Sequence, residues 1–218
     1  MQERARRPDY GLYVVTDEGL SRGRSHTQIA ERALAGGADV IQLRDKKLEG
    51  RQLMEHARAI RKLTGEAGKL FIVNDRVDVA LASGADGVHL GQEDMALADA
   101  RALAPKGFLI GVTVHDVPEA VAAERGGADY LGLSPIFATG SKSDAGSACG
   151  PDMLRKVKRA VSVPVVAIGG INAANAREVL EAGADGLAVI SAVASQPDVE
   201  AAARALKAVI VQFRNNKG

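Results

Sequence analysis

The chain has 218 residues, 46% of them hydrophobic and 25% charged, which fits a single well-buried domain over residues 1–218 with a core from about residue 10 to 213. The net charge of +1 and the 3% aromatic content exclude a general affinity for nucleic acid, so anionic ligands need local basic groups. A single cysteine, Cys149, and no apolar run near the roughly 18 residues of a membrane span favour a soluble cytoplasmic protein.

Short apolar runs alternate with alanine-rich helical stretches along the chain. The expected strands are Tyr10–Thr16, Val40–Leu43, Leu70–Val73, Gly87–Leu90, Phe108–Val112, Tyr130–Leu133, Pro164–Ile168 and Gly186–Val189. Helices are expected over Thr27–Leu34, from about Leu48 to Leu63, in a short stretch ending at Ser83, and in a last stretch reaching about Phe213. This alternation requires parallel strands joined by crossover helices.

The tripeptide Gly-Ala-Asp occurs at residues 37–39, 84–86, 127–129 and 183–185, each time between a helical stretch and an apolar run. The glycine is expected to end the helix in the left-handed conformation, and the apolar residues after the aspartate form a buried strand. Because the copies precede every second expected strand, they indicate eight strand-helix units. The sequence therefore predicts a single-domain (β/α)8 TIM barrel, whose site lies at the carboxyl ends of the strands.

Alternation along the strands predicts which residues line the interior of the barrel. Ile41, Leu43, Val88 and Leu90 share the apolar parity and should face the helices. The interior layer is expected to hold Gln42, His89, Gly132 and Ala188, each three residues past the aspartate of a Gly-Ala-Asp tripeptide. Arg44 lies one layer nearer the mouth, where an arginine is costly without an anionic partner.

Two cations follow the second expected strand. Arg44 offers a planar fork of donors and Lys46 a point charge, a combination suited to phosphate oxygens. Gln42, on the same face, adds an amide that can read the edge of a heterocycle. The alternative is an internal salt bridge of these cations to Asp75 or Asp94.

Carboxylates follow the third and fourth expected strands, at Asp75 after Asn74 and at Asp94. Two carboxylates from neighbouring strand ends, combined with substrate phosphates, form a typical Mg²⁺ site, although without phosphate the pair would bind the metal weakly. The alternative for Asp94 is that it caps the following helix.

The later strand ends carry hydroxyls, glycines and a histidine. Thr113 can donate to a phosphate, and His115 can act as an acid or base, although Asp116 and Pro118 also read as a helix start. For both His89 and His115 a structural role is favoured.

The longest irregular segment, Ser134–Gly150, is expected to be a mobile lid or else a simple surface loop, and it supplies Thr139, Ser141 and Lys142. Backbone N–H groups at Gly169-Gly170 and Ile190-Ser191 can cradle a phosphate, as loops after the seventh and eighth barrel strands commonly do.

Taken in order, the strand-end motifs resemble those of the thiamine-phosphate synthase family from about Leu12 to Ala194. The motifs are QLRDK, NDR, DGVHLGQED, IGVTVH, GADYLGLSPIF with the downstream Lys142, VPVVAIGGI and GLAVISA. The resemblance implies a (β/α)8-barrel transferase that joins hydroxymethylpyrimidine diphosphate to a thiazole phosphate with Mg²⁺, releasing pyrophosphate.

The same resemblance implies residue roles. It implies that Gln42, Arg44, Lys46 and Asn74 bind the pyrimidine diphosphate and that Asp75 and Asp94 ligate the Mg²⁺ ion. Thr113 stands where the family usually has serine, and Lys142 faces the leaving diphosphate; these two join Arg44 and Lys46 as the expected catalytic residues. The thiazole phosphate is assigned to Thr139, Gly140, Ser141, Gly169, Gly170, Ile190 and Ser191.

One departure from the family pattern is Ser134, which replaces an expected glycine. Three alternatives stay open. A thiazole tautomerase of the same fold would use a histidine on the turn that here reads Ser134-Pro135, a phosphosugar isomerase would need His115 and Glu93 as its acid-base pair, and the barrel can also be a non-catalytic ligand-binding protein. The expected partners are small molecules, and a homo-oligomer is left open.

Overall fold

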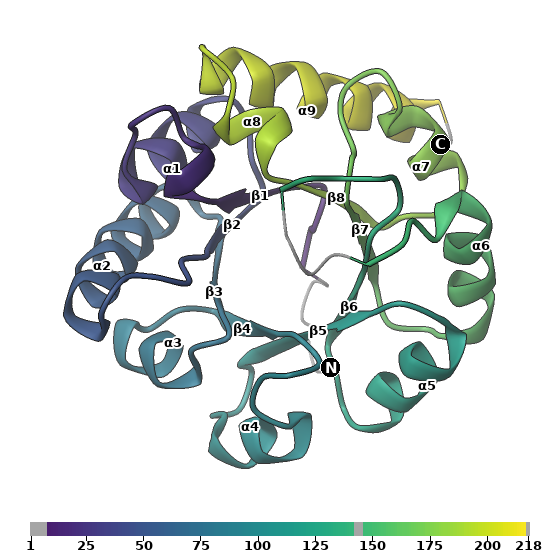
Figure 1. Ribbon diagram of the computed structural model, residues 1–218, viewed down its shortest axis with the longest axis horizontal. Coiled ribbons are helices and arrows are strands. Elements are labelled where there is room, and N and C mark those ends of the chain that lie inside the picture. Colours follow the sequence, from purple (N-terminus) through teal and green to yellow (C-terminus); the bar gives the residue numbers. More distant parts are fainter. Residues whose placement is uncertain (1–7, 142–145, 217–218) are drawn as a thin grey trace, which may run out of the picture.

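The computed structural model describes residues 8–141 and 146–216. Within these residues eight parallel strands pair in chain order and close into a barrel, with β8 paired to β1 (Figure 1). The strands are β1 (Leu12–Thr16), β2 (Val40–Leu43), β3 (Leu70–Asn74), β4 (Gly87–Leu90), β5 (Leu109–Val114), β6 (Tyr130–Leu133), β7 (Val165–Ile168) and β8 (Gly186–Val189). The predicted (β/α)8 barrel is confirmed.

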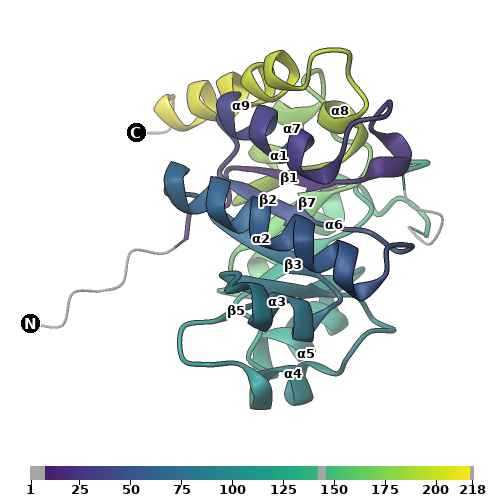
Figure 2. The same ribbon diagram turned by 90° about the vertical axis from the view of Figure 1, so that its left-hand side faces the viewer.

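Helices surround the barrel, and Figure 2 shows α2 and α3 lying over the outer side of β2 and β3. The helical elements are η1 (Glu18–Leu20), α1 (His26–Ala35), α2 (Gly50–Ala67), α3 (Val77–Ser83), α4 (Leu97–Leu103), α5 (Val117–Arg125), α6 (Gly150–Ala160), α7 (Ala176–Glu181), α8 (Ser191–Ala194) and α9 (Val199–Asn215). Among the described residues, none of these helices has the length and apolar character that crossing a membrane requires.

The expected bounds of β2, β4, β6 and β8 are confirmed, and the differences elsewhere have local causes. Helix α2 begins at Gly50 rather than at about Leu48, because the Asp45 side chain accepts hydrogen bonds from the N–H groups of Lys47 and Leu48 and makes a turn there. Strand β5 continues past Val112 to Val114, because its last residues stay in register with β6.

The glycines of the four Gly-Ala-Asp joints have positive φ, as predicted. The φ values are 95° at Gly37, 68° at Gly84, 91° at Gly127 and 104° at Gly183. Residues with a Cβ rarely adopt this conformation, so these positions favour glycine. Each joint leads directly into one of the even-numbered strands.

The joint aspartates have a further role that the sequence analysis did not predict. One carboxylate oxygen of each accepts a hydrogen bond from a backbone N–H near the start of the preceding strand. The pairs are Asp39 with Leu12 at 2.9 Å, Asp86 with Phe71 at 2.8 Å, Asp129 with Ile110 at 2.8 Å and Asp185 with Val165 at 2.7 Å. Lysine or arginine side chains pair with all four carboxylates. The repeat therefore connects neighbouring strands at the amino-terminal end of the barrel.

The core has the two layers that the alternation predicts. Ile41, Leu43, Val88 and Leu90 are buried between the strands and the helices. The interior cluster includes Tyr10, Tyr13, Val15, Val40, Ile72, Tyr130, Val166, Ala188 and Ile190. The four residues expected in one interior layer, Gln42, His89, Gly132 and Ala188, line a common small cavity.

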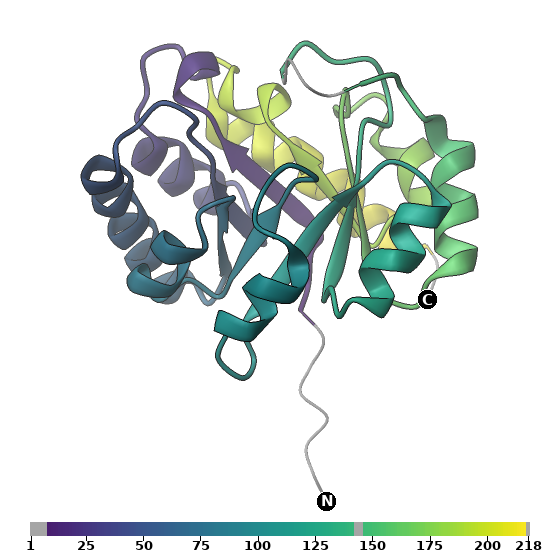
Figure 3. The same cartoon turned by 60° about the horizontal axis from the view of Figure 1, so that its bottom comes forward.

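The loops that follow the strands gather at one end of the barrel. Figure 3 shows them along its upper edge, with η1 in purple on one side and the segment after β6 in teal-green on the other. The candidate site residues lie at this end.

Candidate active site

A polar cavity of about 280 Å³ opens at the carboxyl ends of β2 to β6. Its lining consists of Arg44, Lys46, Asn74, Asp75, Gly91, Gln92, Glu93, Asp94, Thr113, His115 and Ser134. The structure thus brings together the cations, carboxylates, amide and hydroxyl that the sequence analysis predicted at four successive strand ends.

Both cations of this cavity pair with carboxylates. The Arg44 Nη1 atom donates to Asp17 Oδ2 at 3.0 Å, and the Lys46 ammonium group donates to Asp75. The salt-bridge interpretation therefore holds for Lys46, whereas the partner of Arg44 is one that the sequence analysis missed. Asp17 directly follows β1, so its position at a strand end was the available signal.

Asp75 and Asp94 lie close enough to share a hydrogen bond. Burial, followed by the bond to Asp94, raises the pKa of Asp75 to about 6, although Lys46 opposes the shift. Burial also acts to raise the pKa of Asp94, but the bonds from Asp75 and from the Gly91 N–H, at 2.7 Å, leave it lowered. One proton shared between the two carboxyl groups relieves their repulsion.

The helix-capping interpretation of Asp94 is wrong. Helix α4 begins at Leu97 after Ala96, and no side chain caps it. The Asp94 carboxylate, three residues before the helix starts at Leu97, instead closes a tight turn by accepting from the Gly91 N–H group.

The carboxylate pair suits a divalent cation. Two close carboxylates repel each other unless a proton or a cation lies between them, and Mg²⁺ prefers such oxygen ligands. In the part of the chain that the structure describes, no group of three or more histidine, cysteine, aspartate or glutamate side chains can hold a metal ion. Asp75 and Asp94 thus present two carboxylates, fewer than the ligands that a complete Mg²⁺ site needs.

A buried chain of hydrogen bonds forms the floor of the site. Gln42 Nε2 donates to the Tyr13 hydroxyl at 2.7 Å, and this hydroxyl lies 2.9 Å from that of Tyr130. His89 contacts the Tyr130 hydroxyl through Nδ1 at 3.1 Å and Thr113 Oγ1 through Nε2 at 2.9 Å. The chain connects Gln42 to Thr113 and gives His89 the structural position that was favoured. Tyr13 and Tyr130 were not among the residues predicted from the sequence, although the alternation that places Gly132 inside the barrel also places Tyr130 there.

His115 lines the cavity but is bonded away from it. Its Nδ1 atom lies 2.9 Å from Glu119 Oε2, and Asp116 accepts from the Glu119 N–H at the start of α5. The helix-start interpretation is confirmed. The carboxylate partner of His115 is thus Glu119 rather than Glu93, although His115 and Glu93 both line the cavity.

A second, narrower cavity of about 20 Å³ lies at the ends of β6, β7 and β8. It is lined by Ser134, Thr139, Ser141, Ile168, Gly169, Gly170, Ile171, Ala188, Val189, Ile190 and Ser191. The Ser141 hydroxyl donates to Ser191 Oγ at 3.0 Å and so connects the segment after β6 to the loop after β8. Gly140 is exposed and does not line this cavity.

Close packing explains the two glycines after β7. Gly169 and Gly170 both have positive φ, at 105° and 65°. A Cβ on Gly169 would lie 2.6 Å from Pro135 Cβ, and one on Gly170 would lie 2.7 Å from Phe137 Cβ. Side chains there would push away the segment that follows β6, so the glycines keep that segment against the cavity.

Ser134 lines both cavities, so the two meet at the residue that departs from the family pattern. The predicted lid, Ser134–Gly150, is described on either side of residues 142–145. Lys142 lies outside the described residues, so its predicted position stays untested.

Polar side chains and glycines concentrated at the carboxyl ends of barrel strands define the protein as a (β/α)8-barrel enzyme. Sequence comparison gives the family. The family profile described as thiamine monophosphate synthase matches residues 12–193, and the chain belongs to this family.

Named relatives agree with this assignment. The chain is 66% identical over 205 residues to a thiamine-phosphate synthase from Methanocella arvoryzae, covering 94% of this chain and 97% of the relative. It is 62% identical over 198 residues to a thiamine-phosphate synthase from Methanoculleus marisnigri, and the match covers 91% of this chain and 94% of the relative. A solved structure of a thiamine phosphate pyrophosphorylase from Pyrococcus furiosus superposes with a TM-score of 0.89 at 46% identity. The superposition covers 95% of this chain and 98% of that structure. The chain is accordingly a transferase.

Proposed function

We propose that this protein joins 4-amino-2-methyl-5-hydroxymethylpyrimidine diphosphate to thiazole phosphate, or to its carboxylate, giving thiamine phosphate and pyrophosphate. The observation that carries the proposal is the meeting of two different polar cavities at Ser134. One presents cations and paired carboxylates, and the other presents glycines and hydroxyls. The names of the relatives support the same reaction.

The pyrimidine diphosphate occupies the larger cavity in this proposal. Arg44 and Lys46 bind the diphosphate, for which their charges and donors are suited. Asn74 and Gln42 bind the pyrimidine, and Gln42 has a fixed amide because Tyr13 accepts one of its hydrogen atoms. Binding requires Arg44 and Lys46 to exchange Asp17 and Asp75 for phosphate oxygens.

Asp75 and Asp94 would hold Mg²⁺ together with the diphosphate. When bound there, the ion would supply charge neutralisation for the departing pyrophosphate. The transfer of Lys46 from Asp75 to the diphosphate frees the Asp75 carboxylate for this role. Because the described residues offer two carboxylates there rather than a complete ligand set, the metal and the diphosphate bind together.

The reaction proceeds by dissociation. The bond between the pyrimidine methylene and the diphosphate oxygen breaks, its electron pair leaves with pyrophosphate, and the electron-rich aminopyrimidine stabilises the resulting cation. The thiazole nitrogen then forms the new C–N bond with its lone pair, so no side-chain nucleophile is needed. Arg44, Lys46 and the Thr113 hydroxyl stabilise the leaving group.

Lys142 completes this set by analogy with the family alone, since it lies outside the described residues. We expect Lys142→Ala to lower kcat by about 10²-fold or more, a typical loss for one preorganised charge contact. An unchanged kcat would remove Lys142 from the mechanism.

The thiazole phosphate binds with its phosphate group at the narrower cavity. Backbone N–H groups at Gly169, Gly170, Ile190 and Ser191 bind the phosphate, with Thr139 and Ser141 beside it. Gly140, which the family resemblance also assigned here, lies outside the cavity lining. The glycines there allow a phosphate to approach the backbone closely. We also propose a cytoplasmic location, which the single cysteine supports.

The direct test is incubation of the purified protein with both phosphorylated substrates and Mg²⁺. Thiamine phosphate is measured by its fluorescent oxidation product, and pyrophosphate by an enzyme-coupled assay. The proposal predicts equal amounts of the two products, both dependent on Mg²⁺. Absence of both products under every metal condition would contradict it.

A further inference from the structure

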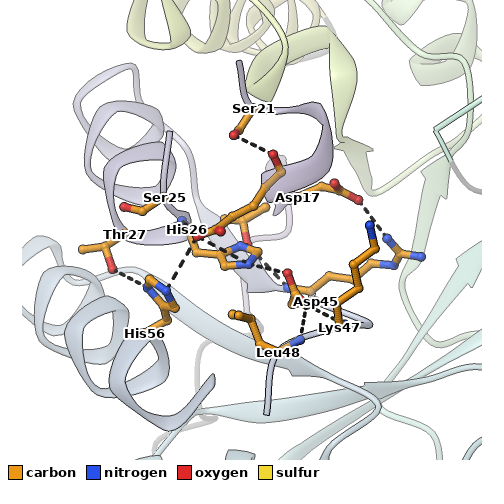
Figure 4. Close-up of polar contacts among 12 residues, drawn as sticks. Asp17, Ser21, Ser25, His26, Thr27, Asp45, Lys47, Leu48 and His56 are labelled. Carbon is orange, nitrogen blue, oxygen red and sulfur yellow. Dashed lines mark hydrogen bonds and ion pairs between the residues drawn. The ribbon is translucent and has the colours of Figure 1, made fainter. Parts of the chain in front are cut away.

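A polar cluster that includes His26, Asp45 and His56 connects α1 and α2 to the loop after β2 (Figure 4). None of these three residues lines either cavity. The centre of the cluster is His26, the first residue of α1, whose side chain is fully buried. The His26 Nε2 atom lies 3.0 Å from Asp45 Oδ2, and Nδ1 lies 2.7 Å from Thr16 Oγ1. The imidazole therefore connects the end of β1 to the loop after β2.

The hydrogen bonds fix the tautomer of the ring. Burial lowers the pKa of His26 despite the opposing effect of Asp45 and Glu18, so the ring is neutral in the folded protein at neutral pH. The Asp45 carboxylate is an acceptor only, because its own pKa is held low: burial acts to raise it, but the bonds from the Leu48 and Lys47 N–H groups outweigh burial. His26 Nε2 thus donates to Asp45, and Nδ1 accepts from the Thr16 hydroxyl.

Asp45 in turn holds the backbone of the loop after β2. Its Oδ1 atom accepts from the Lys47 N–H at 2.6 Å and from the Leu48 N–H at 2.7 Å. With Oδ2 bound to His26, both carboxylate oxygens are used. The turn that places Lys46 at the cavity therefore depends on a carboxylate whose orientation His26 determines.

Thr16 provides a second connection. Because its hydroxyl hydrogen goes to His26, its oxygen remains free to accept from the Arg44 N–H, at 3.4 Å. The next residue, Asp17, accepts from the Arg44 guanidinium. On one side of Lys46 the His26 ring contacts Arg44 through Thr16. On the other side it contacts Lys47 through Asp45.

From these contacts we infer that His26 is a positioning residue for the diphosphate, acting through Asp45 and Thr16 to hold Arg44 and Lys46 in place. The inference rests on the proposed function. The two ring nitrogens of His26 contact Thr16 at the end of β1 and Asp45 in the loop after β2, so the ring fixes these two segments relative to each other. An apolar residue at this position would leave the Asp45 carboxylate without its donor.

His56 is a matched control. Its ring lies 5.3 Å from that of His26, but its Nδ1 atom lies 3.1 Å from Thr27 Oγ1 and its Nε2 atom lies 3.6 Å from Glu18 Oε1. These contacts join α1, α2 and η1 and leave the Arg44 loop aside. Loss of the His56 side chain should therefore disturb helix packing without moving the cations.

Two substitutions at His26 separate its two contacts. The amide nitrogen of His26→Gln corresponds to Nε2 and can still donate to Asp45, whereas His26→Asn places its amide near the Nδ1 position and cannot reach Asp45. We expect His26→Asn to raise KM for the pyrimidine diphosphate about tenfold, a size typical of one lost hydrogen bond to a charged group. KM for thiazole phosphate should change less than about twofold. His26→Gln should raise the pyrimidine KM less than His26→Asn does, because it keeps the bond to Asp45 and loses only the contact with Thr16, and His56→Asn should stay near wild type.

Amide hydrogen exchange gives a readout that does not depend on turnover. His26→Asn should speed exchange at the Lys47 and Leu48 amides, with little change in α9, whereas His26→Gln should preserve their protection. If His26→Asn does not fold, Asp45→Asn replaces it, because it keeps an acceptor for these amides but loses the charge that faces His26.

The two proposals fail in different ways. An inactive wild-type protein contradicts the proposed function, while the exchange data still test the contacts of His26. An active wild type with an unchanged pyrimidine KM in His26→Asn overturns the positioning role. Equal increases in both KM values also overturn it, since they indicate a general structural effect.

Discussion

At the scale of single residues, the site is organised by pairs of opposite charge. Arg44 pairs with Asp17 and Lys46 with Asp75. The sequence predicted that these cations stand at the mouth, because position along a strand fixes the layer that a residue occupies. It did not predict Asp17 as a partner, because a contact between two loops depends on how both loops fold.

Asp94 should be required for the metal. We expect Asp94→Asn to raise the Mg²⁺ concentration for half-maximal rate about tenfold or more, because one of two carboxylate ligands is lost. The control is Glu93→Gln, since Glu93 lies on the same turn and lines the same cavity but is exposed. Steady-state rates over a Mg²⁺ titration give both values, and an equal response of the two variants would argue against Asp94 as a ligand.

His26 should make stability depend on pH. Because burial lowers its pKa below the ordinary 6.5, the unfolded chain takes up this proton before the folded chain does. Its contribution is therefore present above pH 6.5 and is lost as the pH falls below that value, with Asp45, Glu18 and His56 as the neighbouring titratable groups.

We expect the free energy of unfolding to decrease more between about pH 7.5 and 5.5 in wild type than in His26→Gln. Urea unfolding at both pH values measures this difference. The raised pKa of Asp75 acts in the opposite direction, since it stabilises the fold as the pH falls, but it is common to both proteins and cancels. A parallel pH response in the two proteins would contradict the buried neutral state of His26.

At the scale of elements, the repeated joint explains why the strands were predictable. Glycine with positive φ ends the helix, and alternation of apolar residues then defines the strand and its two faces. The hydrogen bonds that the joint aspartates accept from the preceding strand were not predictable, because they require the register between strands that only the closed barrel establishes.

Asp39 provides a test of these connections. It is 3% exposed and accepts from the Leu12 N–H and from Lys69 and Lys207. We expect Asp39→Asn to lower the free energy of unfolding by about 2 kcal/mol, the range of charge-assisted hydrogen bonds, because asparagine keeps one acceptor but not the charge.

The matched control for Asp39 is Asp152→Asn. Asp152 forms an exposed ion pair with Arg155 on α6, which should contribute less than about 0.5 kcal/mol. Urea unfolding curves for the two variants give the comparison. Equal stabilities would mean that the joint aspartates do not hold the strands together.

At the scale of the whole molecule, closure of the barrel turns separate strand ends into one site. Residues after β2 through β6 share one cavity, residues after β6 through β8 share another, and both include Ser134. The strand ends that carry polar residues were predictable from the sequence. Because the strands pair in chain order, residues after consecutive strands are neighbours at the mouth of the barrel. The division at Ser134 was not predictable, because it depends on how the segment after β6 packs against Gly169 and Gly170.

The central claim is that each cavity binds one substrate. Its most direct test is a comparison of Lys46→Ala with a Ser141→Ala, Ser191→Ala double variant, measuring KM for each substrate in both proteins. We expect a crossed result: Lys46→Ala raises KM mainly for the pyrimidine diphosphate, and the serine variant raises KM mainly for thiazole phosphate, each by about tenfold. An increase for the same substrate in both variants would contradict the division of the site.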